Sequence, residues 1–179
     1  MGLDKPHTLY RLGGDLSVTN LGDVQGFPEG YVNAAGITNT GDMYYRHGPS
    51  SDFYQLDLPT LTASLVCNFS DIGGQQDNIG DIAYNPIDGY FYGTRDNSNI
   101  LVKLDLENCT ETQISLSRHI QDANGAFYIA ADGTAYGYEN ESGKFTQINL
   151  STGLVEDLGS SAPTSVSYTH LTLPTICSV

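Results

Sequence analysis

The chain has 179 residues and is strongly acidic, with 21 Asp and Glu against 7 Lys and Arg and a formal net charge of −14. Such a charge repels phosphate groups, so nucleic acids and anionic membrane surfaces are disfavoured partners. No apolar run approaches the roughly 20 residues that span a bilayer, and membrane insertion is not expected. The first residues, Met1 to Pro6, contain no apolar leader segment.

One pattern of strand-like segments repeats along the chain at intervals of 44 to 48 residues. A partial copy comes first, because Leu9–Leu12 matches the start of the segment Phe53–Leu58. Full copies of that segment follow at Leu101–Leu106 and Phe145–Leu150. Apolar and polar residues alternate in these segments, which indicates β-strands with one buried face.

Two further segments precede each full copy and keep nearly the same spacing from it. The nearer one ends in tyrosine and occurs at Gly41–Tyr45, Asp88–Tyr92 and Asp132–Tyr136. The farther one is short and occurs at Ala35–Thr38, Asp81–Tyr84 and Ala126–Ile129. Turn residues separate the segments, and an Asp-Gly pair supplies the positive φ angles that a tight hairpin requires.

Each repeat unit therefore contains four short strands. In the middle unit we expect strands at 79–85, 89–94, 100–106 and 111–115, and we read Ser115–Asp122 as a loop. Four antiparallel strands every 40 to 50 residues or so are typical of a β-propeller blade. A lone blade has a face that it cannot bury, whereas blades stacked around an axis cover one another.

The sequence thus predicts an all-β fold, an incomplete β-propeller that forms an open arc. The units lie near 8–24, 34–70, 79–116 and 125–159, which gives a half blade and about three four-stranded antiparallel blades. A complete ring typically has about 4–8 blades, so we expect the remaining blades of the same chain to be missing. An antiparallel sandwich and a β-solenoid are the alternatives.

The C-terminal segment 166–179 differs from the rest because it contains no Asp, Glu, Lys or Arg. Val166–Thr175 is one reading frame of GTC TCT TAT ACA CAT CTG ACG CTG CCG ACG, which resembles the transposase-end adapter of short-read sequencing libraries. We interpret 166–179 as translated adapter and 1–165 as the native, partial propeller. A genuine terminal β-strand is the alternative.

Repeated acids are the candidate metal ligands. Asp42, Asp88 and Asp132 recur at the same hairpin of successive units. A ring of carboxylates near a propeller axis could hold Ca²⁺, which prefers oxygen ligands. Turn chemistry is the simpler explanation, so we expect no cofactor and keep calcium as the alternative. No Gly-x-Ser-x-Gly motif is present, and the sequence offers no catalytic residue.

Tyrosine is abundant, with twelve in the chain and no tryptophan. Tyr45, Tyr92 and Tyr136 end the same repeated segment, and we expect them to pack between adjacent blades. A row of exposed tyrosines that binds sugars or peptides is the alternative, because the tyrosine ring is amphipathic.

Cysteines and histidines give weaker indications. Cys67 and Cys109 lie at different blade positions, one on a fourth strand and one in the turn before it. Neighbouring blades could bring the two together, and an exported protein would oxidise them, but a disulfide requires Cα atoms within about 7 Å. Cys177 belongs to the tail. His47 and His119 are expected in exposed loops.

The middle unit also resembles a known family. The run Ile79–Gly93, which contains Ile-Ala-Tyr-Asn-Pro-Ile-Asp-Gly, followed by Leu101–Leu106, resembles an uncharacterised propeller-like repeat family. Its members occur in secreted and cell-surface proteins of bacteria, often beside adhesin-like modules. The likeness covers roughly Thr8–Gly159 and is weaker in the flanking units, because Gly41-Asp42 inverts the turn in the first and Ala130–Asp132 lacks the Asn-Pro in the third. It implies a propeller fold and an extracellular or cell-surface address, and it implies no catalytic residue.

Three functions compete at this point. The preferred hypothesis is a non-catalytic exported propeller module, a spacer or a binding or adhesion platform in a larger bacterial surface protein, with an unknown protein or glycan as its ligand. The first alternative is a fragment of a Ca²⁺-dependent propeller hydrolase, lactonase or lyase. The second is an intracellular protein-interaction propeller, although the lack of tryptophan excludes the WD form.

Overall fold

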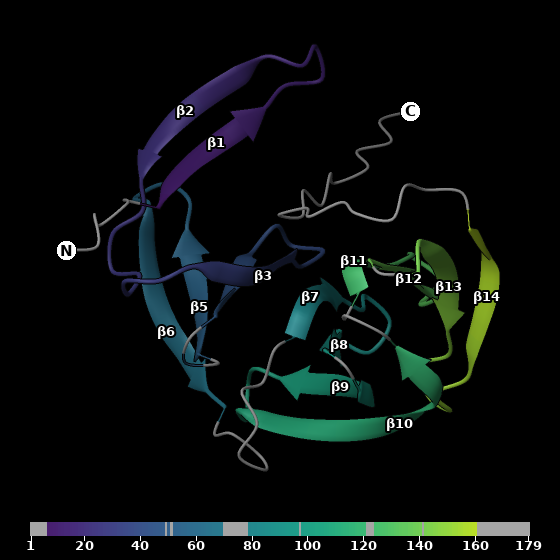
Figure 1. Ribbon diagram of the computed structural model, residues 1–179. Coiled ribbons are helices and arrows are strands. Elements are labelled where there is room, and N and C mark those ends of the chain that lie inside the picture. The colour runs from purple at the N-terminus through teal and green to yellow at the C-terminus, as the bar shows by residue number, and fades with distance from the viewer. Residues whose placement is uncertain are drawn as a thin grey trace.

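The computed structural model describes residues 7–48, 50, 52–69, 79–96, 98–120, 124–140 and 142–160. Within these residues every regular element is a β-strand, and the strands form one two-stranded and three four-stranded sheets (Figure 1). The prediction of an all-β, incomplete propeller with three blades and a half blade is confirmed. The described part of the chain contains no helix that is long and apolar enough to cross a membrane. The predicted adapter segment lies outside the described residues.

The strands follow the chain from blade to blade, and all neighbouring strands are antiparallel. The half-blade consists of β1 (Thr8–Leu12) and β2 (Val18–Asp23). The first blade consists of β3 (Val32–Ile37), β4 (Met43–His47), β5 (Asp52–Asp57) and β6 (Thr62–Asn68). The second consists of β7 (Ile79–Tyr84), β8 (Phe91–Arg95), β9 (Ser98–Asp105) and β10 (Thr110–Ile120). The third consists of β11 (Asn124–Ile129), β12 (Ala135–Glu139), β13 (Lys144–Ile148) and β14 (Val155–Ser160).

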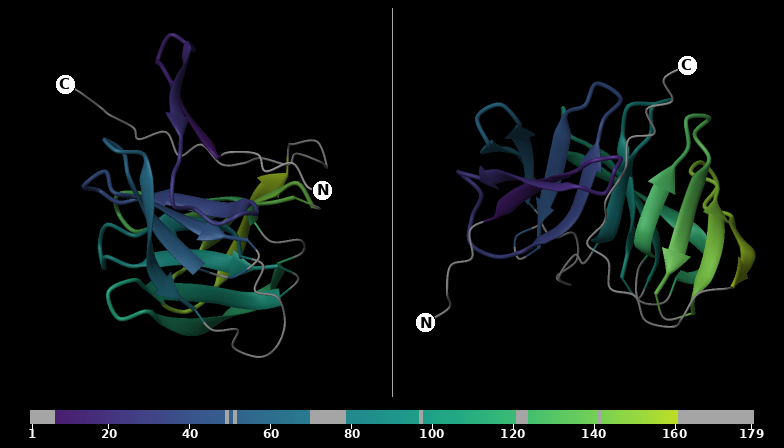
Figure 2. Two further views of the ribbon diagram at one scale, coloured as in Figure 1. Left: turned by 90° about the vertical axis from the view of Figure 1, so that its left-hand side faces the viewer. Right: turned by 90° about the horizontal axis from the view of Figure 1, so that it is seen from above.

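The blades are arranged around an arc, with β3, β7 and β11 on the inside and β6, β10 and β14 on the perimeter (Figure 1). Strand β7 contacts both β3 and β11, so the inner strands of successive blades touch. Figure 2 shows the same order from two other sides. The arc is open between the half-blade and the third blade.

Three apolar clusters fill the spaces between consecutive sheets. The cluster between the first and second blades contains Ala34, Phe53, Cys67, Phe69, Ile79, Ile82, Phe91, Val102 and Leu104. The cluster between the second and third blades contains Ala83, Tyr92, Leu101, Leu116, Ile120, Phe127, Ile129, Ala135, Ile148 and Val155. A smaller one joins Tyr45, Tyr54, Leu56 and Ala63 of the first blade to Leu9, Val24 and Phe27. Because full burial of one large apolar side chain contributes about 1.5–3 kcal/mol, these clusters hold the blades together.

Cross-strand pairing shows which positions of the blades correspond. The residues Tyr44, Tyr92 and Tyr136 pair with Gln55, Lys103 and Gln147, which occupy one position of the third-strand pattern. A register shift follows the first residue of that pattern at Phe53 and Phe145, and the same shift follows Leu9 in the half-blade. The half-blade therefore corresponds to the third and fourth strands of a complete blade.

Two details of the predicted strands are wrong. Tyr45 does not share a position with Tyr92 and Tyr136, because the pairing assigns that position to Tyr44. Strand β10 also continues to Ile120, through the segment predicted as a loop. Its register shifts between Ser115 and Ile120, and this irregularity breaks the alternation that identifies a strand in the sequence.

Candidate functional site

The three candidate metal ligands all lie in turns between the first and second strands of their own blades. The Asp88 carboxylate accepts hydrogen bonds from the Tyr90 N–H at 3.3 Å and the Tyr92 hydroxyl at 2.6 Å. It also lies 3.4 Å from the Lys103 ammonium group, which sits 3.8 Å from the centre of the Tyr90 ring. Asp132 accepts a hydrogen bond from the Thr134 N–H at 2.9 Å, and this bond lowers the pKa of Asp132.

Asp42 differs from the other two in position and in contacts. It follows Gly41 in its turn, whereas Asp88 and Asp132 precede the corresponding glycines. The three acids therefore lie at the same hairpin of successive blades, as predicted, but Asp42 occupies a different position within its turn. In the part of the chain that the structure describes, no group of three or more His, Cys, Asp or Glu side chains is arranged to hold a metal ion.

A pocket of 310 Å³ lies beside Asp42 on the first blade. The β3–β4 turn, the β5–β6 turn and strands β5 and β6 supply its wall, which consists of Thr40, Gly41, Asp42, Gln55, Leu56, Asp57, Leu58, Pro59, Thr62 and Ser64. The Thr40 hydroxyl donates to Asp42 at 2.5 Å, and the Gln55 amide donates to the same carboxylate at 3.4 Å. Hydroxyl, amide and carboxylate groups thus share a concave surface, which is more polar than the mostly apolar pockets that usually bind small ligands.

The three tyrosines predicted to pack between blades have different surroundings. Tyr92 is 3% exposed and belongs to the cluster between the second and third blades. Tyr45 is 6% exposed and faces Phe27, with ring centres 5.6 Å apart, and burial raises its pKa to about 12. Tyr136 is 36% exposed and stacks on Tyr128, which is 50% exposed. Inter-blade packing therefore does not hold for Tyr136 within the described structure.

Cys67 and Cys109 form a disulfide in the structure, with an S–S distance of 2.11 Å and a Cα–Cα distance of 5.3 Å. Cys67 lies on β6, and Cys109 lies in the turn between β9 and β10. The bond therefore links the perimeter of the first blade to that of the second. Adjacent blades bring the two cysteines together despite their different blade positions.

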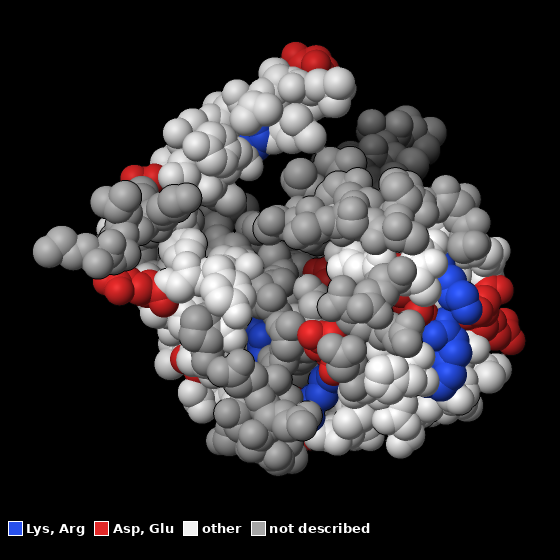
Figure 3. All heavy atoms as spheres, in the orientation of Figure 1, with Lys and Arg blue, Asp and Glu red and all other residues white. Residues whose placement is uncertain are grey.

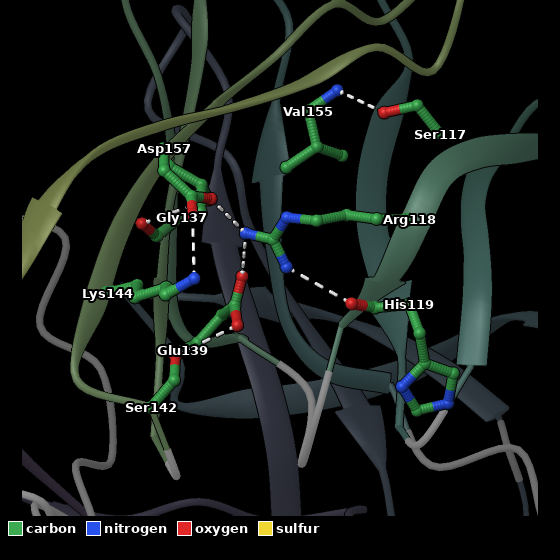
Figure 4. Close-up of polar contacts among 10 residues, drawn as sticks. Ser117, Arg118, His119, Gly137, Glu139, Ser142, Lys144, Val155 and Asp157 are labelled. Atoms are coloured by element: carbon green, nitrogen blue, oxygen red, sulfur yellow. Dashed lines mark hydrogen bonds and ion pairs between the residues drawn. The ribbon is translucent and has the colours of Figure 1, made fainter.

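A charged network joins the second and third blades and has no counterpart among the sequence predictions (Figure 4). Arg118 on β10 donates to Glu139 on β12 and to Asp157 on β14, each at 2.5 Å. Lys144 also binds Asp157, at 2.7 Å, and the Ser142 hydroxyl donates to Glu139 at 3.0 Å. Figure 3 shows basic and acidic side chains side by side over this edge of the arc.

Two of the buried polar residues, Asp81 and His47, were not expected from the sequence to be buried. Asp81 on β7 is 1% exposed, and its carboxylate accepts hydrogen bonds from the N–H groups of Ile82 and Phe127, each at 2.9 Å. His47 is 5% exposed, so its predicted place in an exposed loop is wrong. Its Nδ1 lies 2.7 Å from the Ser50 hydroxyl. The acid within the apolar run Ile79–Tyr84 is the one sequence signal that could have indicated Asp81.

A comparison against protein families also identifies this chain as a repeat protein. The profile of the family described as "Repeat of unknown function (DUF6923)" matches residues 2–169. The chain belongs to this repeat family. The match covers all three blades and the half-blade, and it ends within the C-terminal tail. No curated protein matches the DUF6923 chain.

Solved structures share the fold of the DUF6923 chain at low sequence identity. A protein of unknown function from Bacteroides thetaiotaomicron is 16% identical with a TM-score of 0.67, covering 87% of this chain and 43% of its own. Virginiamycin B lyase from Staphylococcus aureus is 12% identical with a TM-score of 0.60, covering 90% and 51%. An auxiliary nutrient binding protein from B. thetaiotaomicron is 14% identical with a TM-score of 0.58, covering 83% and 40%. The chain thus spans about half the length of these proteins or less, and the likeness shows the fold alone.

Proposed function

We propose that this chain is part of a non-catalytic, exported propeller module that serves as a spacer or binding platform in a larger bacterial surface protein. The observation that carries the proposal is the disulfide between Cys67 and Cys109. Disulfides persist in secreted and periplasmic proteins and are rare in the reducing cytosol. A bond between two blades stabilises a propeller that must remain assembled outside the cell.

The pocket beside Asp42 supports the binding part of the proposal. Its carboxylates accept hydrogen bonds, while Gln55, Thr62 and Ser64 can both donate and accept them. These groups match the alternating donors and acceptors of a hydroxyl-rich ligand such as a glycan. A neutral glycan is favoured over an anionic one because the whole chain carries a formal charge of −14.

A comparison of two cellular compartments tests the exported address. The full chain is produced once in the bacterial periplasm and once in the cytoplasm, and free thiols are counted by mass spectrometry after alkylation. The expected result is an oxidised Cys67–Cys109 pair in the periplasmic protein and lower stability of the reduced, cytoplasmic protein. Equal stability of the two forms would remove the argument for export.

An array of neutral glycans tests the binding platform. The full chain is compared with Asp42→Asn, which alters the pocket, and with Asp132→Asn, which alters a turn outside it. Binding that falls at least tenfold in Asp42→Asn and is retained in Asp132→Asn supports a site at this pocket. The proposal for the pocket fails if no glycan binds or if both variants lose binding equally.

The proposed module acts without a cofactor, and calcium titration by calorimetry tests this part. Asp42, Asp88 and Asp132 are the calcium candidates from the sequence. Heat of Ca²⁺ binding that disappears in Asp88→Asn or Asp132→Asn would contradict a cofactor-free module and would favour a calcium-dependent one.

A further inference from the structure

We propose that the pocket beside Asp42 takes a glycan with a free amino group, and that the ammonium group of this hexosamine lies between the carboxylates of Asp42 and Asp57. The proposal rests on the glycan binding proposed above and names the class of sugar that the pocket selects.

The first observation is the pair of carboxylates in one pocket. Its described wall contains Asp42 and Asp57 and no Lys, Arg or His. Met43 pairs with Leu56 across β4 and β5, so Asp42 and Asp57 come one residue beyond this pair on neighbouring segments. Like charges on opposite residues of adjacent strands repel each other. A cation between the two carboxylates offsets that repulsion.

The second observation is that no basic side chain among the described residues forms an ion pair with either carboxylate. The described ion pairs join other acids to Arg95, Lys103, Arg118 and Lys144. Residues 7–69 contain six acids and two arginines, and Arg46 is only 1% exposed. The same charge that disfavours an anionic glycan therefore favours a cationic one at the first blade.

Both carboxylates keep acceptor capacity for a further donor. Three donors from neighbouring residues already bind Asp42, and the nearest is the Thr40 hydroxyl at 2.5 Å. Asp57 accepts a hydrogen bond from the Thr60 hydroxyl at 2.5 Å. An ionised carboxylate has about four acceptor positions, whereas an ammonium group has only donors. The threonines therefore hold the carboxylates in place and leave lone pairs for the ligand.

The rest of the wall suits the ring and the hydroxyl groups of a sugar. Gln55, Thr62 and Ser64 both donate and accept hydrogen bonds. Leu58, which is 45% exposed, and Pro59 supply an apolar surface against which the C–H groups of a sugar ring pack. The volume of 310 Å³ is at the lower end of the roughly 300–1,000 Å³ of ligand pockets, so the pocket suits one sugar residue of a longer glycan.

A simple amine or a lysine side chain fits this pocket less well than an amino sugar. Either one supplies the ammonium group for the carboxylates. Neither has hydroxyl groups to bind Gln55, Thr62 and Ser64. A hexosamine offers the ammonium group, the hydroxyl groups and an apolar ring face together, and it is the occupant to which the proposal commits.

Calorimetry with the full chain and three matched tetrasaccharides tests the proposal. The β-1,4-linked oligomers of glucosamine, N-acetylglucosamine and glucose differ at C2, which carries an amino, an acetamido or a hydroxyl group. At pH 6 the amino group is protonated, because amino groups such as the α-amino group have a pKa of about 8. The glucosamine oligomer is expected to bind at least about tenfold more tightly than the neutral two, and less tightly as salt is added.

Variants of the pocket locate the ammonium group. Asp57→Asn is expected to remove the preference for the glucosamine oligomer, whereas Asp57→Glu keeps the charge and retains the preference. Asp132→Asn removes a charge outside the pocket and is the control for net charge. Thermal unfolding followed by circular dichroism checks that each variant is folded.

Equal affinity for the three oligomers overturns the proposal and leaves the proposed glycan binding intact. A loss of preference in Asp132→Asn as large as that in Asp57→Asn also overturns it, because net charge then explains the preference. A lysine tetrapeptide that binds as tightly as the glucosamine oligomer has the same consequence, since the pocket then recognises charge without sugar. Binding of none of the three oligomers contradicts the glycan-binding function itself.

Discussion

The carboxylate of Asp81 in the second blade accepts a hydrogen bond from the backbone N–H of Phe127 in the third blade, at 2.9 Å. Its other oxygen accepts from the N–H of Ile82 in its own strand. Burial raises the pKa of Asp81 to about 7, and the two N–H donors offset part of that effect. The buried carboxylate of Asp81 thus links the inner strands β7 and β11 of two blades through hydrogen bonds.

The first prediction concerns the pH dependence of stability. The folded-state pKa of Asp81 is raised from 3.8 to about 7, so the folded protein binds the proton more tightly than the unfolded chain. The contribution of Asp81 to the free energy of unfolding is therefore greatest below about pH 4. It falls by on the order of 1 kcal/mol per pH unit as the pH rises through this window to about 7.

Urea unfolding of the wild type and of Asp81→Asn at pH 5 to 8 measures this effect. The stability advantage of the wild type over the variant should shrink as the pH rises, because the amide does not titrate. Asp132→Asn is the control, because the pKa of Asp132 is lowered from 3.8 by its hydrogen bonds to Thr134 and thus stays below this pH range. A constant difference between wild type and Asp81→Asn would rule out the raised pKa.

The second prediction concerns the disulfide. The Cys67–Cys109 bond closes a loop with a sequence separation of 42, so its removal should lower the free energy of unfolding by about 2–5 kcal/mol. Urea unfolding of Cys67→Ser with Cys109→Ser measures this loss, and Cys177→Ser is the control. A double variant as stable as the control would show that blade packing alone holds the first two blades together.

The third prediction concerns the charged network. Arg118→Met keeps most of the aliphatic stem but leaves Glu139, which is 2% exposed, without its cation. The expected loss of stability is about 1–3 kcal/mol, because an unpaired buried carboxylate is costly. Lys144→Met removes the other cation bound to Asp157, at an exposed pair, and should cost less than about 1 kcal/mol. Similar losses in the two variants would assign the effect to surface charge rather than to burial.

The architecture could be read from the sequence because the repeated features are local. Apolar and polar residues alternate along the third strand of each blade, and this pattern involves only residues that are close in the chain. The turn between the first and second strands contains a glycine in each blade, and Gly41, Gly89 and Gly133 all have the positive φ that their turns require. The register was harder to read. Two tyrosines, Tyr44 and Tyr45, are adjacent in the first unit, and the spacing from the turn glycine favours Tyr44, as the cross-strand pairing shows.

The inter-blade contacts could not be predicted in the same way, because they depend on residues that are far apart in the chain. Arg118 and Asp157 are 39 residues apart, and Asp81 and Phe127 are 46 apart. Asp81 and Phe127 lie in repeated strand segments, but neither residue recurs in the other units, so comparison of the units does not reveal the contact. The burial of the tyrosines depends in turn on whether a following blade covers each one.

The last prediction uses that difference between Tyr92 and Tyr136, which occupy the same position of consecutive blades. Tyr92 is 3% exposed beneath the third blade, so Tyr92→Ala leaves a cavity and should cost about 3–5 kcal/mol. Tyr136→Ala changes a side chain on the uncovered face and should cost no more than about 1 kcal/mol. Urea unfolding of both variants at one pH measures the two losses. Equal losses would mean that Tyr136 is covered in solution, whereas a large loss at Tyr92 alone follows from an open third blade.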